Sequence, residues 1–138
     1  VPEILWGGST SLHKDEESLW ISGVWKPQDN AHFTTHDAEA DLVYVGGNKI
    51  DWVGLDQLLE AQAKGELDPE LMYTQSIMVV QLEYLEKGFI KEVAKKLAFY
   101  QDQTNEGLIE WKGFEEIVEI WKKKYEEVPS MRWFASGL

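Results

Sequence analysis

The residues with the clearest chemical potential lie in one short polar stretch. His32 and His36 stand four residues apart, so they would share a face in a helix or a strand, and Glu39 and Asp41 follow closely. Such a set could complete a metal shell or form an acid–base pair. We keep His32, His36 and Asp41 as weak catalytic candidates and assign no metal site, because histidines in such a stretch usually lie on an exposed polar loop or cap a turn.

Motifs with a well-defined mechanical role are missing from the sequence. It contains no phosphate-binding P-loop, no Gly-x-Gly-x-x-Gly, no Gly-x-Ser-x-Gly and no His-Glu-x-x-His. A calcium loop starting at Asp37 would need glycine and glutamate where Leu42 and Asn48 stand. The absence of cysteine also excludes disulfides, thiolate zinc sites and iron–sulfur clusters. The sequence therefore assigns no cofactor.

One enzyme hypothesis is compatible with the size and composition of the chain. In a small cone-shaped α+β enzyme of the NTF2-like kind, His13, His36 and Asp41 would meet Tyr73 and Tyr84 around an aromatic pocket. That pocket would carry out proton abstraction or dehydration by His/Asp acid–base chemistry. The comparison concerns general size and composition, and no motif supports it.

Seven tryptophans are the second unusual feature of the chain. Trp52 and Trp121 recur on periodic apolar faces, which predicts core positions for both. The other aromatic candidates lie in extended or terminal segments, where tryptophan often marks an interface. The residues that we expect to bind a partner are Trp6, Trp20, Trp25, Trp133 and Phe134.

The charge is strongly acidic and unevenly distributed. The 138 residues carry a formal net charge of -12, and residues 1–70 contribute -10 of it. Arg132 is the only arginine, so planar bidentate capture of phosphates has almost no residues to use. These features argue against nucleic acid as a partner. They favour a protein, or a larger complex, with a basic surface.

The sequence constrains the cellular location only loosely. No apolar run is long enough to span a membrane, although peripheral association stays open. Because Val1 is not an initiator methionine, removal of an organelle-targeting peptide is compatible with the sequence. The compartment is not determined.

The N-terminal third predicts short extended segments separated by turns. Residues 4–6, 19–25 and 42–45 have strand-like apolar patterns, and glycines follow the first and the last of them. Residues 26–41 contain Pro27, Asp29 and Asn30 and show no apolar period. They predict a surface loop.

Helical spacing begins at Trp52 and predicts three helices, over about residues 52–64, 69–103 and 110–127. Gly65 is expected to end the first helix. Asp68-Pro69-Glu70 combines an N-cap residue, a proline and an acid, which together predict the start of the second. Pro129 follows the end of the third, after which residues 130–138 form an aromatic tail.

These elements predict a single domain over residues 1–138. It comprises an extended acidic region (1–50), a helical region (51–128) and the aromatic C-terminal tail (129–138). The predicted fold class is mainly α, with three helices packed against a strand-bearing N-terminal region. An α+β fold with a small antiparallel sheet is the alternative, because the N-terminal segments could pair with one another.

The leading functional expectation is a non-enzymatic, acidic interaction protein. It would be a small accessory subunit that docks on a larger assembly, for example an organellar respiratory or photosynthetic complex. The missing catalytic motifs, the acidic N-terminal half and the aromatic ends motivate this expectation. One alternative is an acidic inhibitor, such as an immunity protein or a nucleic-acid mimic. The other is the NTF2-like pocket enzyme.

Overall fold

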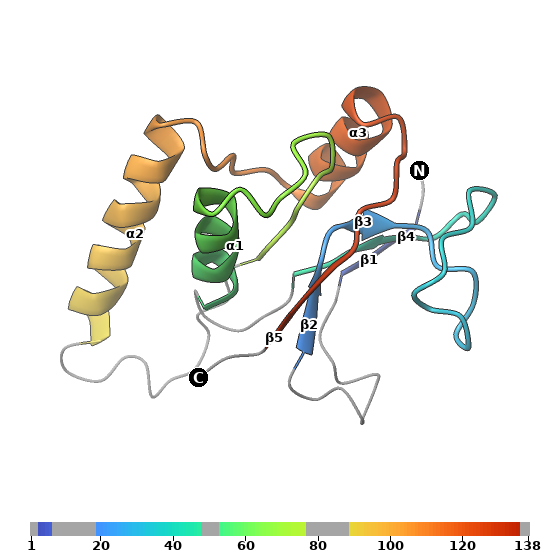
Figure 1. Cartoon of the computed structure of the whole chain (residues 1–138), viewed down its shortest axis with the longest axis horizontal. Coiled ribbons are helices and arrows are strands. Elements are labelled where there is room, and N and C mark those ends of the chain that lie inside the picture. The colour runs from blue at the N-terminus through green and yellow to red at the C-terminus, as the bar shows by residue number, and fades with distance from the viewer. Residues whose placement is uncertain (1–2, 7–18, 48–52, 77–88, 136–138) are drawn as a thin grey trace.

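The computed structural model describes residues 3–6, 19–47, 53–76 and 89–135 (Figure 1). The strands in chain order are β1 (Ile4–Trp6), β2 (Leu19–Ser22), β3 (Val24–Trp25), β4 (Val43–Val45) and β5 (Arg132–Ala135). The helices are α1 (Val53–Ala63), α2 (Phe89–Asn105) and α3 (Phe114–Lys124). The α+β alternative therefore fits this structure, and the mainly α prediction is met only in part.

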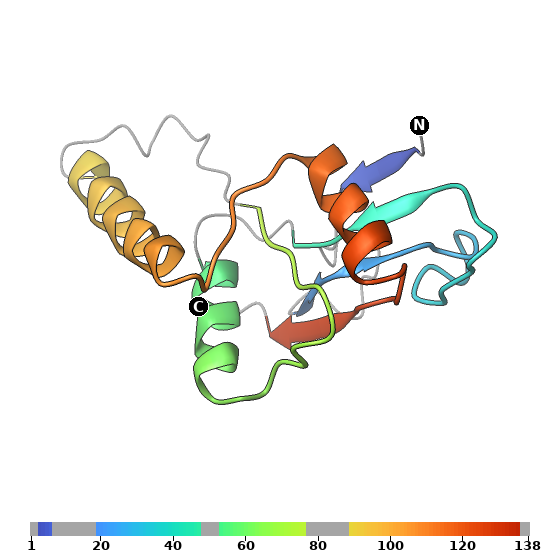
Figure 2. The same cartoon turned by 90° about the horizontal axis from the view of Figure 1, so that it is seen from above.

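The strands form two small sheets. The first strand, β1, belongs to one sheet, and the last strand, β5, belongs to the other. In the first, β4 lies between β1, to which it is parallel, and β3, to which it is antiparallel. In the second, β2 pairs antiparallel with β5, so that Ile21 stands opposite Trp133. Both views place the sheets on one side of the molecule and α2 on the other, with α1 between them (Figures 1 and 2). None of the described helices is long and apolar enough to cross a membrane.

Alternation along β3 and β4 builds a core on both faces of the first sheet. Val24, Val43 and Val45 point to one face, where they pack with Val118 and Trp121 of α3. Trp25 and Tyr44 belong to the other face. There their rings stack at 4.6 Å and pack with Phe33 of the 26–41 loop. Because both faces are covered, these short strands are apolar almost without interruption.

Local signals locate two helix ends correctly. The first helix, predicted over 52–64, is α1, and the chain leaves it through Gly65 at φ 71°. α2 ends at Asn105, two residues before Gly107 at φ 80°. α3 is shorter than the predicted 110–127. It begins after Gly113, whose backbone N–H donates to the Glu116 carboxylate at 3.3 Å.

The prediction of one helix over residues 69–103 is wrong at its N-terminal end. Asp68 caps a turn, accepting a hydrogen bond from the Glu70 N–H at 2.9 Å, but no helix follows through Ser76. Residues 77–88 lie outside the described part of the chain, and α2 begins at Phe89. The segment that follows the turn is held by side chains and backbone of the strand region, and this tertiary bonding overrides the local start signal.

Thr74 is the centre of that bonding. Its backbone N–H donates to the Ser22 hydroxyl at 2.9 Å, and the Ser22 hydroxyl donates to its carbonyl at 2.8 Å. The Thr74 hydroxyl accepts from the Gly23 N–H at 3.1 Å, and it lies 3.0 Å from the Gly46 carbonyl oxygen. Ser130 adds a fourth segment, accepting from the Val24 N–H and donating to the Met72 carbonyl. We call these residues the Thr74 network.

Glycines let the segments of the Thr74 network approach closely. A Cβ atom on Gly23, at φ 128°, would lie 2.1 Å from the Ser130 carbonyl oxygen. A Cβ atom on Gly47, at φ 93°, would lie 2.3 Å from the Thr74 carbonyl oxygen. Both positions therefore require glycine for conformation and for space.

A separate polar cluster holds α2 against α1. The buried Tyr100 of α2 donates its hydroxyl to Asp56 of α1 at 2.7 Å, and Lys96 bonds to the same carboxylate at 2.5 Å. Desolvation and the Asp56 hydrogen bond raise the pKa of Tyr100 well above its usual range. Tyr100 therefore stays a neutral donor to the Asp56 carboxylate.

We expect Thr74→Val to destabilise the protein by roughly 2 to 3 kcal/mol, measured by urea unfolding. Valine keeps the shape of threonine but leaves the buried Gly23 N–H without its acceptor. Thr34→Val, on the exposed 26–41 loop, is the matched control and should change the free energy of unfolding by less than about 0.5 kcal/mol. Equal effects of the two substitutions would contradict the role given to Thr74.

Candidate functional site

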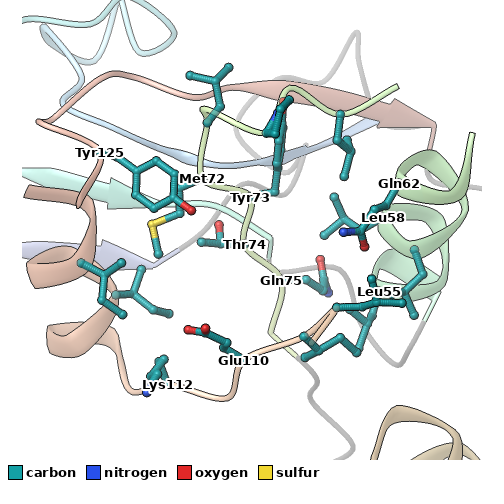
Figure 3. Close-up of a pocket in the computed structure, with 18 of the residues that line it drawn as sticks. Leu55, Leu58, Gln62, Met72, Tyr73, Thr74, Gln75, Glu110, Lys112 and Tyr125 are labelled. Atoms are coloured by element: carbon teal, nitrogen blue, oxygen red, sulfur yellow. The ribbon is translucent and has the colours of Figure 1, made fainter. Parts of the chain in front are cut away.

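A groove of about 600 Å³ lies between α1 and α3 (Figure 3). Leu55, Leu58 and Leu59 line it from α1, and Ile117 and Ile120 line it from α3. The leucines follow helical spacing, which places all three on one side of α1. Two helix surfaces therefore present aliphatic side chains to the same space.

The other walls come from irregular segments. Residues 67–75, positioned by the Thr74 network, contribute Met72 and Tyr73, and residues 107–112 close the opposite side. At this second wall, Leu108 and Trp111 line the groove while they stay 42% and 51% exposed. The Trp111 indole N–H donates to the Thr104 hydroxyl at 2.9 Å. Large apolar side chains thus form a partly open rim.

Polar groups make up a sizeable part of the groove lining. Figure 3 shows Gln62 and Gln75 toward the α1 side and Tyr125 toward the α3 side. Four charged residues line the groove, namely Asp68, Glu110, Lys112 and Lys124. A volume of this size falls within the roughly 300 to 1,000 Å³ of typical binding clefts. The mixed lining is suited to receive a segment that presents apolar and polar side chains together.

The structure does not bring the candidate catalytic residues to this groove. His32 is exposed, with its ring nitrogen 2.9 Å from the Asp29 carboxylate, and Asp41 is exposed as well. His36 lies on the 26–41 loop, where Nδ1 accepts from the Lys26 N–H at 3.1 Å. Among the described residues, no group of three His, Cys, Asp or Glu side chains is arranged to hold a metal ion.

Of the residues that the NTF2-like hypothesis places in its pocket, one lines the groove in the described part of the chain. Tyr73 lines the groove, but His36 and Asp41 do not. His13 and Tyr84 lie outside the described residues. The described residues therefore do not assemble the proposed pocket, which stays a prediction.

His36 contributes to a contact between the 26–41 loop and the end of α3. Its ring meets Trp121 edge-on at 6.3 Å, and Lys26 bonds to Glu127 at 3.3 Å beside it. Burial, reinforced by the positive charge of Lys26, holds the pKa of His36 below its ordinary value, although Asp37 and Glu127 oppose this. These contacts describe a structural histidine.

The structure separates the aromatic residues expected to bind a partner. Trp25 is fully buried and donates its indole N–H to the Phe33 carbonyl at 2.9 Å, and partner binding by Trp25 stays a prediction. Trp133 is half-buried against that same core face, and the Phe134 ring lies 5.1 Å from the Arg132 guanidinium. Trp6 and Trp20 lie in strands, but their side chains are outside the described set. Partner binding by Trp133 and Phe134 stays a prediction.

Sequence reasoning missed the rim of the groove. Trp111 falls inside the predicted helix 110–127, and Leu108 falls in the predicted connection before it. A signal was present, because Gly107 and Gly113 bracket a short stretch that contains Leu108, Ile109 and Trp111. Apolar residues in a linker between two glycines indicate either a docking surface or a covered patch.

We expect the free energy of unfolding to fall as the pH drops below 6.5, the ordinary pKa of histidine. The pKa of folded His36 is lowered, so the unfolded chain binds the proton first. The stabilisation is therefore complete above 6.5 and is lost as the pH falls toward the folded value. His36→Gln should flatten this decline in urea titrations at about pH 5 to 8.

His32→Gln is the matched control, because the His32 ring lies on the surface and, among the described residues, bonds to Asp29 alone. The decline should persist in this variant. Persistence of the same decline in His36→Gln would show that another group controls it.

Comparison with known proteins does not indicate a function for the groove. No protein-family model matches the chain, and no curated protein or solved structure matches it. The indications of the protein's function are therefore the shape, lining and charge of the groove itself.

Proposed function

We propose that this chain is a non-enzymatic interaction protein, a small accessory subunit that docks on a larger protein assembly. In this proposal the groove between α1 and α3 receives an amphipathic helix of the partner. The single observation that carries the proposal is the set of aliphatic side chains in the groove lining, which continues onto the exposed rim residues Leu108 and Trp111.

A helix suits this groove for geometric reasons. α1 and α3 stand on opposite sides of it, and each offers aliphatic side chains spaced by three or four residues (Figure 3). An amphipathic helix presents its own apolar side chains at the same spacing, so the two sets can interdigitate. Each leucine-sized side chain that becomes buried contributes about 1.5 to 3 kcal/mol.

The charge of the chain favours a basic partner. A net charge of -12 attracts a positively charged surface over distances longer than direct contact. That attraction speeds the encounter, whereas the apolar groove would supply most of the affinity. The two features together support an accessory subunit on a basic assembly.

The test compares two leucines of similar exposure. Leu108 lines the groove and is 42% exposed, whereas Leu97 of α2 is 52% exposed and does not line it. We expect wild-type protein and the Leu97→Gln variant to co-purify with a fixed companion from cells of the source. Leu108→Gln should weaken the binding of that companion by about tenfold, because a buried leucine contact is lost.

Circular dichroism and urea unfolding verify that both variants fold. Release of the companion by Leu97→Gln but not by Leu108→Gln would move the interface to α2 and overturn the assignment to the groove. Migration of the wild-type protein alone, at the mass of one chain, would contradict the accessory-subunit proposal itself.

A further inference from the structure

The four charged side chains of the groove differ in what they already contact. One Asp68 oxygen accepts from the Glu70 N–H, which commits that carboxylate to a turn. The Lys124 amine lies 5.6 Å from the centre of the Tyr125 ring. Glu110 and Lys112 make no hydrogen bond or ion pair with any other described residue.

Glu110 is the charge best placed to meet an occupant. It projects from the segment that joins α2 to α3, and Figure 3 shows its carboxylate directed into the groove. The side chain is exposed when the groove is empty, so water solvates it. A helix seated between α1 and α3 would displace that water.

Displacing the water would leave a carboxylate against aliphatic side chains. Burying an unpaired carboxylate costs several kcal/mol, enough to cancel the gain from one or two apolar anchors. Lys112 does not offset the free-energy cost of burying the Glu110 carboxylate, because the two side chains form no ion pair in the structure. An occupant with a purely apolar surface is therefore disfavoured.

The two groove lysines do not impose the same requirement. A lysine carries its charge on a long flexible stem, so Lys112 and Lys124 can cover an apolar occupant with their methylene groups and keep their amines in water. Glutamate has a shorter stem and less freedom to withdraw. The carboxylate, rather than the lysines, selects the chemistry of the occupant.

We infer that the partner helix carries a lysine or arginine, flanked by apolar anchors, that pairs with Glu110 when the helix fills the groove. This inference rests on the proposed function and adds the chemistry of the partner segment. The net charge of -12 acts in the same direction, because it draws a basic segment toward the chain before contact.

The experiment selects ligands from a displayed library of helical peptides about 15 residues long, since shorter helices are marginal in water. Leucines are fixed at helical spacing and the positions between them are randomised. Clones selected on wild-type protein should be enriched in lysine or arginine at one position. Changing that residue to glutamine should weaken binding to wild-type protein by about tenfold, measured by fluorescence anisotropy.

Two single substitutions test whether Glu110 causes the preference for a basic residue, and a third tests whether the peptides occupy the groove. Glu110→Gln should abolish both the enrichment and the tenfold preference. Glu106→Gln, which removes an exposed acid outside the groove, should keep both. Leu108→Gln should weaken all selected peptides, which verifies that they occupy the groove.

The outcomes separate the inference from the function beneath it. Peptides that bind in the groove without any basic preference, or whose preference survives in Glu110→Gln, would overturn the inference and leave groove docking intact. Failure to select any peptide that Leu108→Gln weakens would overturn groove docking as well.

Discussion

The hydrogen bonds around Thr74 are the constraint on which the rest of the structure depends. They tie the 67–76 segment to Ser22, Gly23 and Gly46, and Ser130 extends them to the strand that closes the second sheet. All of these groups are buried, so each lost bond would leave a polar atom away from water. Regions far apart in the sequence are thereby held at fixed distances, although the sheets contain only short strands.

The groove is a consequence of that constraint. The 67–76 segment runs extended and irregular past the strands, and its outer side becomes one wall between α1 and α3. A helix there would have filled the space with its own side chains. Aliphatic side chains of α1 and α3 line the groove; Leu55 and Leu58 are already nearly buried, whereas the rim residues Leu108 and Trp111 stay partly exposed. The same bonding that stabilises the fold therefore also shapes the groove.

Electrostatics and burial have different roles in this molecule. Near the 26–41 loop, the ion pair of Lys26 with Glu127 and the neutral ring of His36 support packing against Trp121. At the groove, Glu110 has no such partner among the described residues and faces an apolar space. Charges that are already paired maintain the structure, whereas an unpaired charge beside an apolar surface can discriminate between ligands.

Local sequence signals determined the features that depend on a few neighbouring residues. Gly65 and Gly107 mark the ends of α1 and α2 because glycine adopts positive φ at little cost, and a short apolar run followed by glycines predicted the strand at Val43–Val45. Only the tertiary structure decided that Asp68-Pro69-Glu70 begins a turn rather than a helix, because bonds to Thr74 come from residues about 50 positions away. The burial of Trp25 and the existence of the groove were decided in the same way. Each requires side chains from distant segments to pack together, and local sequence patterns do not predict which segments will do so.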